Sequence, residues 1–140
     1  MRIALIEDDD LHAEVVGRWM ARESRVTTFE RFKNATDFLE ASKPTNNASP
    51  EVVFVDYHLG EATGAEFVVK VRSLDDARSD IGIVLISGVD IIEFSEILDG
   101  LDVDGFLLKD DLSRERLTMV AALALQSSRR RQELSELKGR

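Results

Sequence analysis

Residues 52–60, Val-Val-Phe-Val-Asp-Tyr-His-Leu-Gly, place four apolar residues in a row directly before the carboxylate of Asp56. A short apolar run without polar alternation is typical of a strand that is buried on both faces, as in a parallel sheet. Residues 3–6 (Ile-Ala-Leu-Ile) and residues 83–86 (Ile-Val-Leu-Ile) have the same form. The sequence therefore predicts three short strands in the centre of a buried sheet.

Helical patterns separate these strands, with apolar residues every three or four positions, the period of a helix that buries one face. The five stripes are Leu11, Val15, Val16, Trp19 and Met20; Ala35, Phe38 and Leu39; Phe67, Val68 and Val71; Ile91, Phe94, Ile97, Leu98 and Leu101; and Leu117, Val120, Ala121, Ala124 and Leu125. Residues 26–29 and 105–108 are weaker candidates for the second and fifth strands. This alternation predicts an α/β fold, a doubly wound, five-stranded parallel sheet of the flavodoxin-like (βα)5 type with strand order 2-1-3-4-5.

Composition and length agree with one globular domain. The chain has 140 residues, of which 44% are hydrophobic and 32% charged. It contains no cysteine, which excludes disulfides and thiolate metal sites and fits a cytoplasmic protein. No apolar run approaches the roughly 20 residues of a membrane span, and residues 1–7 do not resemble a signal peptide. The net charge of −9 argues against a nucleic-acid surface, because phosphate binding needs clustered cations.

The last helical pattern continues past residue 126 to about Leu137, and this end of the chain is basic. Residues 129–140 contain the cations Arg129, Arg130, Arg131, Lys138 and Arg140 and the acids Glu133 and Glu136. We expect the domain to span residues 1–127 and residues 128–140 to extend its last helix. Two interpretations of this extension remain open, a solvated helix end and a linker to another domain.

Polar residues follow the predicted strands at the points where these strands end. Glu7 and Asp8 follow the first strand, Asp56 the third, Ser87 the fourth and Lys109 the fifth. In a sheet of this order the carboxyl ends of the strands form one edge, so the five side chains should converge there. Three carboxylates repel one another and need a counter-charge. Mg²⁺ can supply it, because this ion binds a few carboxylate oxygens and keeps several waters.

This set of residues suits phosphoryl transfer. With a divalent cation and Lys109 offsetting the negative charge, Asp56 can attack phosphorus and form an acyl phosphate. The hydroxyl of Ser87 can donate a hydrogen bond to the incoming phosphoryl oxygens. The neighbouring acids Asp9 and Asp10 are better explained as capping residues at the start of the first helix.

The same residues resemble the receiver domain of two-component response regulators, of the chemotaxis-regulator type, over roughly residues 1–127. The acidic pair of that family is matched by Glu7 and Asp8, its phosphoacceptor by Asp56, its glycine eight residues later by Gly64, its hydroxyl residue by Ser87, its switch aromatic by Phe106 and its lysine by Lys109. The resemblance implies that Mg²⁺ is bound by Glu7, Asp8, Asp56 and the backbone carbonyl of His58.

The resemblance also implies a function and partners. A sensor histidine kinase or a phosphotransfer protein would supply the phosphoryl group from phosphohistidine. The protein would then act as a signalling switch and not as an enzyme, apart from self-catalysed phosphoryl uptake and slow autodephosphorylation. Ser87 and Phe106 would change a surface that a partner reads, and a homodimer is expected to use the face of the fourth helix, fifth strand and fifth helix.

Some positions depart from the family pattern. Gly60 and Asp110 stand where many receiver domains have proline. Gly60 loosens its loop, and Asp110 removes the cis peptide expected after Lys109, which puts the placement of the lysine in question. Phe106 lacks the hydroxyl of the more common tyrosine, so its ring has no hydroxyl with which to bind a partner.

Three other functions fit the sequence less well. A phosphatase of the haloacid-dehalogenase type needs a second acid two residues after its aspartyl nucleophile, and that position is His58. A flavodoxin-like cofactor binder needs a phosphate loop after the first strand, where residues 7–10 are all acidic. A degenerate receiver that only binds proteins would not need the complete set of acids, hydroxyl and lysine.

Overall fold

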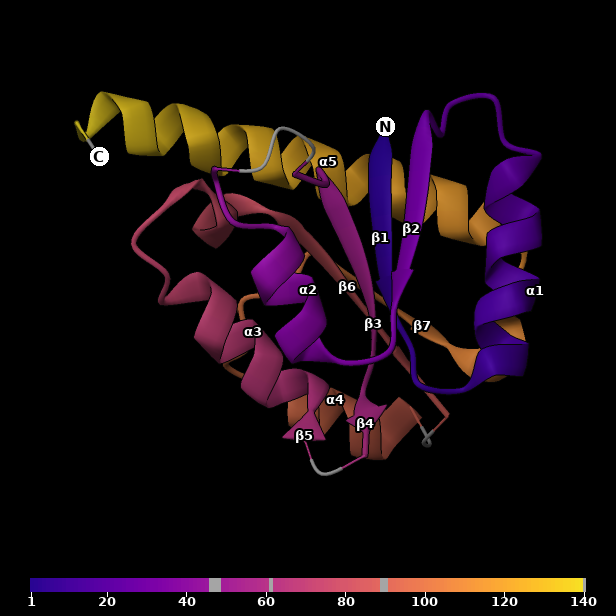
Figure 1. Cartoon of the computed structure of the whole chain (residues 1–140). Helices are drawn as coiled ribbons and strands as arrows, with labels where there is room; N and C mark the ends of the chain where they lie inside the picture. Colours follow the sequence, from indigo (N-terminus) through magenta and orange to yellow (C-terminus); the bar gives the residue numbers. More distant parts are fainter. Residues whose placement is uncertain (46–48, 61, 89–90, 140) are drawn as a thin grey trace.

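The computed structural model describes residues 1–45, 49–60, 62–88 and 91–139, with the backbone alone at residues 91 and 92. Within these residues, five parallel strands form one sheet in the order β2-β1-β3-β6-β7 (Figure 1). They are β1 (Arg2–Ile6), β2 (Thr28–Phe32), β3 (Val52–Asp56), β6 (Gly82–Ser87) and β7 (Gly105–Leu108). The predicted doubly wound parallel sheet with strand order 2-1-3-4-5 is confirmed, with β6 and β7 as its fourth and fifth strands.

Helices cover both faces of this sheet (Figure 1). They are α1 (Asp10–Ala21), α2 (Ala35–Ala41), α3 (Gly64–Arg72), α4 (Ile91–Leu98) and α5 (Arg114–Leu137), with the short 3-10 helices η1 (Ala77–Asp80) and η2 (Lys109–Asp111). None of the helices in the described ranges is long and apolar enough to cross a membrane.

The core has two layers because successive side chains of a strand point to opposite faces. In β3, Phe54 packs with the layer that contains the buried residues of α1 and α5. Val53 and Val55 pack with the other layer, which contains residues of α2, α3 and α4. Since β3 is buried throughout, its unbroken apolar sequence follows from burial on both sides.

Two details of the predicted elements are wrong. The second strand begins at Thr28 rather than Val26, because the Val26 N–H donates to the Glu23 carbonyl in the turn after α1, and pairing with β1 starts at Thr28. The buried face of α1 consists of Ala13, Val16 and Met20, whereas Leu11 is 70% exposed. Helix α1 is therefore rotated relative to its predicted stripe. The predictions did not include the small hairpin of β4 (His58–Leu59) and β5 (Ala62–Thr63).

Helix α5 reaches Leu137 as predicted, but its basic end is not simply solvated. Ser128 is buried, and both terminal nitrogens of Arg131 bind the carboxylate of Asp104, at 2.6 Å (Nη1 to Oδ1) and 2.7 Å (Nη2 to Oδ2). Ser135 donates to a carboxylate oxygen of Asp80 at 3.3 Å. Residues 128–135 are thus bound to the segments that precede β6 and β7, at the amino ends of these strands.

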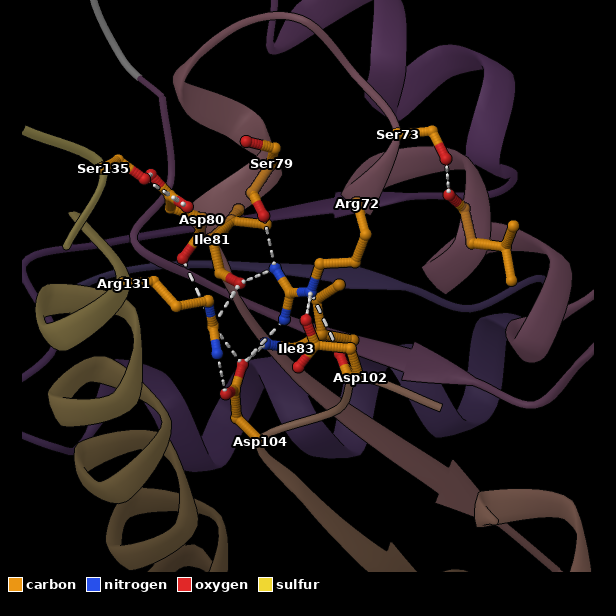
Figure 2. A network of polar contacts seen from close by, with 11 residues as sticks. Arg72, Ser73, Ser79, Asp80, Ile81, Ile83, Asp102, Asp104, Arg131 and Ser135 are labelled. Carbon is orange, nitrogen blue, oxygen red and sulfur yellow. Dashed lines mark hydrogen bonds and ion pairs between the residues drawn. The ribbon is translucent and has the colours of Figure 1, made fainter. Parts of the chain in front are cut away.

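Arg72 of α3 approaches Asp104 from the other side (Figure 2). Its Nη2 lies 3.0 Å from Oδ2 of Asp104, and its Nη1 donates to the Ile81 carbonyl. The Ile83 N–H also donates to Asp104 Oδ2, at 2.8 Å. We call Arg72, Asp104 and Arg131 the Arg–Asp–Arg cluster. It joins α3, β6, β7 and α5 at the amino ends of the strands.

Candidate functional site

The residues predicted to converge do so at the carboxyl edge of the sheet, where β3 leads into β4 (Figure 1). Glu7 and Asp8 follow β1, Asp56 is the last residue of β3, Ser87 ends β6 and Lys109 begins η2 after β7. Carboxylate oxygens of Glu7, Asp8 and Asp56 all lie within 4.8 Å of one another. We call these three residues the acidic cluster.

Lys109 is the cation of this site. Its Nζ lies 3.3 Å from Oδ2 of Asp56 and 3.6 Å from Oε1 of Glu7. Asp110 in place of the family's proline therefore does not prevent Lys109 from reaching the acids. One lysine faces three carboxylates, so negative charge remains in excess within the cluster.

Asp56 carries the least satisfied atom of the site. The residue is only 3% exposed, and its Oδ1 has no hydrogen-bond partner among the residues that the structure describes. A buried carboxylate oxygen without a partner is costly, because it has lost water and gained nothing in return. A hard divalent cation with oxygen ligands fits this position, since Asp56 Oδ1, Glu7 and Asp8 can supply its ligands.

The electrostatics of Glu7 confirm that the acids are crowded. Burial, a side-chain contact with Asp56 and the charge of that carboxylate together raise the pKa of Glu7 from 4.5 to about 8. Burial disfavours the charged form of Lys109, but the carboxylates of Asp56 and Glu7 outweigh it and raise the pKa of the amine above its ordinary value. In the absence of a second cation, Glu7 thus holds a proton near neutral pH.

The two remaining acids of the first loop have other partners. Asp9 is the N-cap of α1 and accepts hydrogen bonds from the N–H groups of Leu11 and His12, as predicted. Asp10 lies in the first turn of α1 and pairs with Arg31 at 2.9 Å. Only Glu7 and Asp8 of this acidic run face Asp56.

Arg31 was missed by the sequence prediction. From β2 its Nε donates to the backbone carbonyl of Glu7 at 2.8 Å, while its Nη2 binds Asp10. The arginine therefore holds the acidic loop from both ends. The predicted second strand ended at residue 29, and the closeness of Arg31 to that strand was the only sequence signal that it could lie near the acids.

Gly64 allows α3 to begin close to Asp56. A Cβ at this position would lie 2.9 Å from Cδ2 of Leu85 and 3.1 Å from Cα of Tyr57, so a side chain would push α3 away from the end of β3. The side chain of His58 is exposed, as predicted, and it stands in β4 rather than in an irregular loop. The use of its backbone carbonyl as a metal ligand stays a prediction.

Ser87 and Phe106 lie on neighbouring strands at this edge. Ser87 is fully buried at the end of β6, and Asp56 pairs with the preceding residue, Ile86. Phe106 in β7 is 39% exposed, and its ring makes an edge-to-face contact with Phe94 of α4. Their predicted roles as switch residues depend on the position of Ser87 on the strand next to Asp56 and on the half-exposed ring of Phe106 one strand further away.

Comparisons with known proteins identify the fold. No family model matches the sequence, and no curated protein matches it. An uncharacterized protein from Neptuniibacter caesariensis has a TM-score of 0.77 at 26% identity, over 94% of this chain and 92% of that chain. A CheY-like response regulator receiver domain protein from Methanospirillum hungatei has a TM-score of 0.74 at 17% identity, over 93% and 97%. The Mn²⁺-bound form of the response regulator Rcp1 has a TM-score of 0.67 at 15% identity, over 86% and 89%. The chain therefore has the fold of response-regulator receiver domains.

Proposed function

We propose that this protein is the phosphoacceptor receiver domain of a two-component response regulator, and that Asp56 accepts the phosphoryl group. The observation that carries the proposal is the environment of Asp56. This buried carboxylate has one oxygen without a partner among the described residues, a lysine 3.3 Å from the other oxygen, and two further acids close enough to share a cation.

The chemistry is a direct phosphoryl transfer from phosphohistidine. One carboxylate oxygen of Asp56 forms a bond to phosphorus, while the bond between phosphorus and the donor's imidazole nitrogen breaks and leaves its electron pair on that nitrogen. A sensor histidine kinase or a phosphotransfer protein is the proposed donor. The product is an acyl phosphate on the last residue of β3.

The acidic cluster is proposed to bind Mg²⁺ through Glu7, Asp8, Asp56 and the backbone carbonyl of His58. The donors are oxygens, as this ion prefers, and the fold relative Rcp1 has a form with Mn²⁺, an ion of similar ligand preference. When bound, the ion neutralises negative charge on the acids and on the phosphoryl oxygens. Mg²⁺ also requires Glu7 to release the proton that it holds in the absence of metal.

Lys109 and Ser87 act on the phosphoryl group after transfer. The ammonium of Lys109 already pairs with Asp56 and Glu7, and it can move to an oxygen of the acyl phosphate without leaving the site. The hydroxyl of Ser87, which ends the strand next to Asp56, can donate a hydrogen bond to another phosphoryl oxygen. Neither residue supplies a general base for rapid hydrolysis, so we propose slow autodephosphorylation and no turnover of other substrates.

The output is a change of surface at α4, β7 and α5. Phosphorylation shifts the population between two conformers only if the phosphoryl group binds one of them better. We propose that Ser87 and Phe106 distinguish these conformers and that a partner, or a second copy of the chain, binds the face that results.

A phosphodonor assay tests the proposal. Incubation with acetyl phosphate and Mg²⁺ should give an acid-stable, base-labile adduct of one phosphoryl group per chain by mass spectrometry, and Asp56→Asn should abolish it. Asp111→Asn is the matched control, because its exposed carboxylate lies in η2 next to the site, and it should retain the adduct. Absence of an adduct in the unmodified protein, or its persistence in Asp56→Asn, would overturn the proposal.

A further inference from the structure

Three aromatic rings connect the residue after Asp56 to the half-exposed Phe106. The ring centroids of Tyr57 and Phe94 are 6.1 Å apart with an interplanar angle of 74°, and those of Phe94 and Phe106 are 5.4 Å apart at 81°. Both contacts are edge-to-face, an arrangement that aromatic pairs favour because the edge of one ring meets the electron-rich face of the next.

Tyr57 is held firmly at the end of this row nearest the acids. Its backbone N–H donates to the Ile86 carbonyl at 2.8 Å, and its own carbonyl accepts from the Gly64 N–H at 2.7 Å. A shift of the main chain at Asp56 must therefore move Tyr57 together with the end of β6 or the start of α3. A displacement of the main chain at Asp56 therefore also displaces the ring of Tyr57.

Phe94 occupies the middle of the row and is shielded from solvent. It is fully buried in the core layer that also contains residues of β3, β6 and α3, and Tyr57 packs against that layer. Close-packed interiors transmit displacement because a ring that moves must push its neighbours. Phe94 is also a residue of α4, so its movement is a movement of that helix.

Phe106 lies at the far end, and packing alone determines the position of its ring. A phenylalanine has no hydroxyl and cannot be held by a hydrogen bond, whether from Ser87 or from any other residue. Among the described residues its ring contact is with Phe94, and 39% of Phe106 is exposed. The degree of exposure of Phe106 therefore depends in part on the position of Phe94.

We propose that Tyr57 and Phe94 form an aromatic relay, in which Tyr57 is a positioning residue that couples the state of Asp56 to the exposure of Phe106. The inference rests on the proposed function, since it specifies how phosphorylation of that site reaches the surface. The relay works through ring packing and requires no hydroxyl on residue 106, which accounts for a phenylalanine at the switch position.

The composition of the chain provides a direct probe, because Tyr57 is its single tyrosine. Protein labelled with 3-fluorotyrosine will give one ¹⁹F resonance. We expect beryllofluoride with Mg²⁺, a mimic of the phosphoryl group, to shift this resonance. Without any mimic, Phe106→Ala should also shift it by at least several linewidths, although residue 106 is one ring removed from Tyr57. Leu123→Ala is the matched control, since Leu123 is an exposed apolar residue of α5 outside the relay, and it should leave the resonance in place.

A second arm measures coupling in the forward direction. In the unmodified protein the amide signals of residues 106 and 107 should shift when beryllofluoride binds. Tyr57→Leu and Phe94→Leu should reduce that shift to less than half, whereas Tyr57→Phe, which keeps the ring, should preserve it. Binding of the mimic is followed separately through the amides of Asp56 and Lys109, so that a loss of coupling is not confused with a loss of binding.

The outcomes separate the relay from the function on which it rests. If beryllofluoride fails to bind the unmodified protein, the proposed function fails. If it binds, and the signals of residues 106 and 107 respond equally in Tyr57→Leu and in the unmodified protein, the relay is refuted. Should the core variants Tyr57→Leu and Phe94→Leu not fold, the surface variant Phe106→Ala decides alone, and an unchanged ¹⁹F resonance refutes the relay.

Discussion

The acidic cluster and the Arg–Asp–Arg cluster lie at opposite ends of the same sheet and have opposite compositions. At the carboxyl edge, three carboxylates share one lysine, and Oδ1 of Asp56 has no partner among the described residues. At the amino edge, one carboxylate, Asp104, is bound by two guanidinium groups and by the Ile83 N–H. The first cluster has more carboxylates than cations, and in the second both carboxylate oxygens of Asp104 accept hydrogen bonds.

This is the difference expected between the proposed metal site and a structural joint. A buried carboxylate surrounded by donors stabilises the fold, because its desolvation is compensated by charge-assisted hydrogen bonds. Crowded carboxylates destabilise the fold through charge repulsion unless a cation is bound. Acids with perturbed pKa values are common at functional sites. Burial and like charge shift a pKa in both clusters: burial and the neighbouring Asp56 raise the pKa of Glu7, and burial and the charge of Arg131 lower the pKa of Arg72. Asp104 opposes the shift of Arg72 from between the two guanidinium groups, whereas Lys109 is the cation that opposes the shift of Glu7 in the acidic cluster.

The largest effect is expected at the amino edge. Asp104→Asn leaves two guanidinium groups without their carboxylate, and because the Asp104 side chain is 3% exposed, water cannot replace it. The free energy of unfolding should fall by about 4 kcal/mol, as for a broken buried ion pair. Urea denaturation measures the change. Asp102→Asn is the matched control, since its carboxylate also pairs with Arg72 but is 63% exposed, and it should cost less than about 1 kcal/mol. Equal losses in both variants would mean that the cluster is not a structural joint.

At the carboxyl edge, ionisation of a carboxylate should lower the stability of the metal-free protein, and a pH titration of the free energy of unfolding tests this. The pKa of Glu7 is about 8 in the folded state against an ordinary 4.5, so between these values the folded chain keeps a proton that the unfolded chain releases. The contribution of Glu7 to stability is therefore complete below about pH 4.5 and is lost as the pH rises through about 8. We expect Glu7→Gln to remove this fall. Parallel stability–pH curves for the two proteins would contradict the assignment, and saturating Mg²⁺ should flatten the curve of the unmodified protein.

The smallest expected effect is that of Asp56→Asn, which should stabilise the metal-free protein, whereas Asp104→Asn should destabilise it. Asp56→Asn removes one of three crowded carboxylates, so the metal-free protein should become more stable by about 1 kcal/mol. Mg²⁺ should then raise the thermal midpoint of the unmodified protein but not that of the variant, because ligand binding to the folded state adds stability only where a site exists. Calorimetry with and without Mg²⁺ checks both statements. If metal-free Asp56→Asn is instead less stable than the unmodified protein, the carboxylate of Asp56 stabilises the fold as that of Asp104 does, and the contrast between the two clusters is wrong.

The sequence located the acidic cluster more completely than it located the Arg–Asp–Arg cluster. Asp56 and Lys109 each follow a short apolar strand, and parallel strands bring their carboxyl ends to one edge whatever the details of packing. Arg131 carried no such signal, since a basic residue near the end of a long helix has many available partners. Its pairing with Asp104 required the length of α5 and the position of β7 to be known together.

Local pattern alone determined the five strands, the five helices and the groups at the strand ends, because side-chain period and strand termination depend on residues close in the chain. The tertiary structure decided which atoms are satisfied. In the folded chain, Asp104 accepts hydrogen bonds from Arg72 of α3 and Arg131 of α5. Arg31 donates to the backbone of the acidic loop. One oxygen of Asp56 has no partner in the described part of the chain. These contacts join residues far apart in sequence, and burial sets their strength, so only the folded arrangement separates the structural carboxylate from the proposed phosphoacceptor.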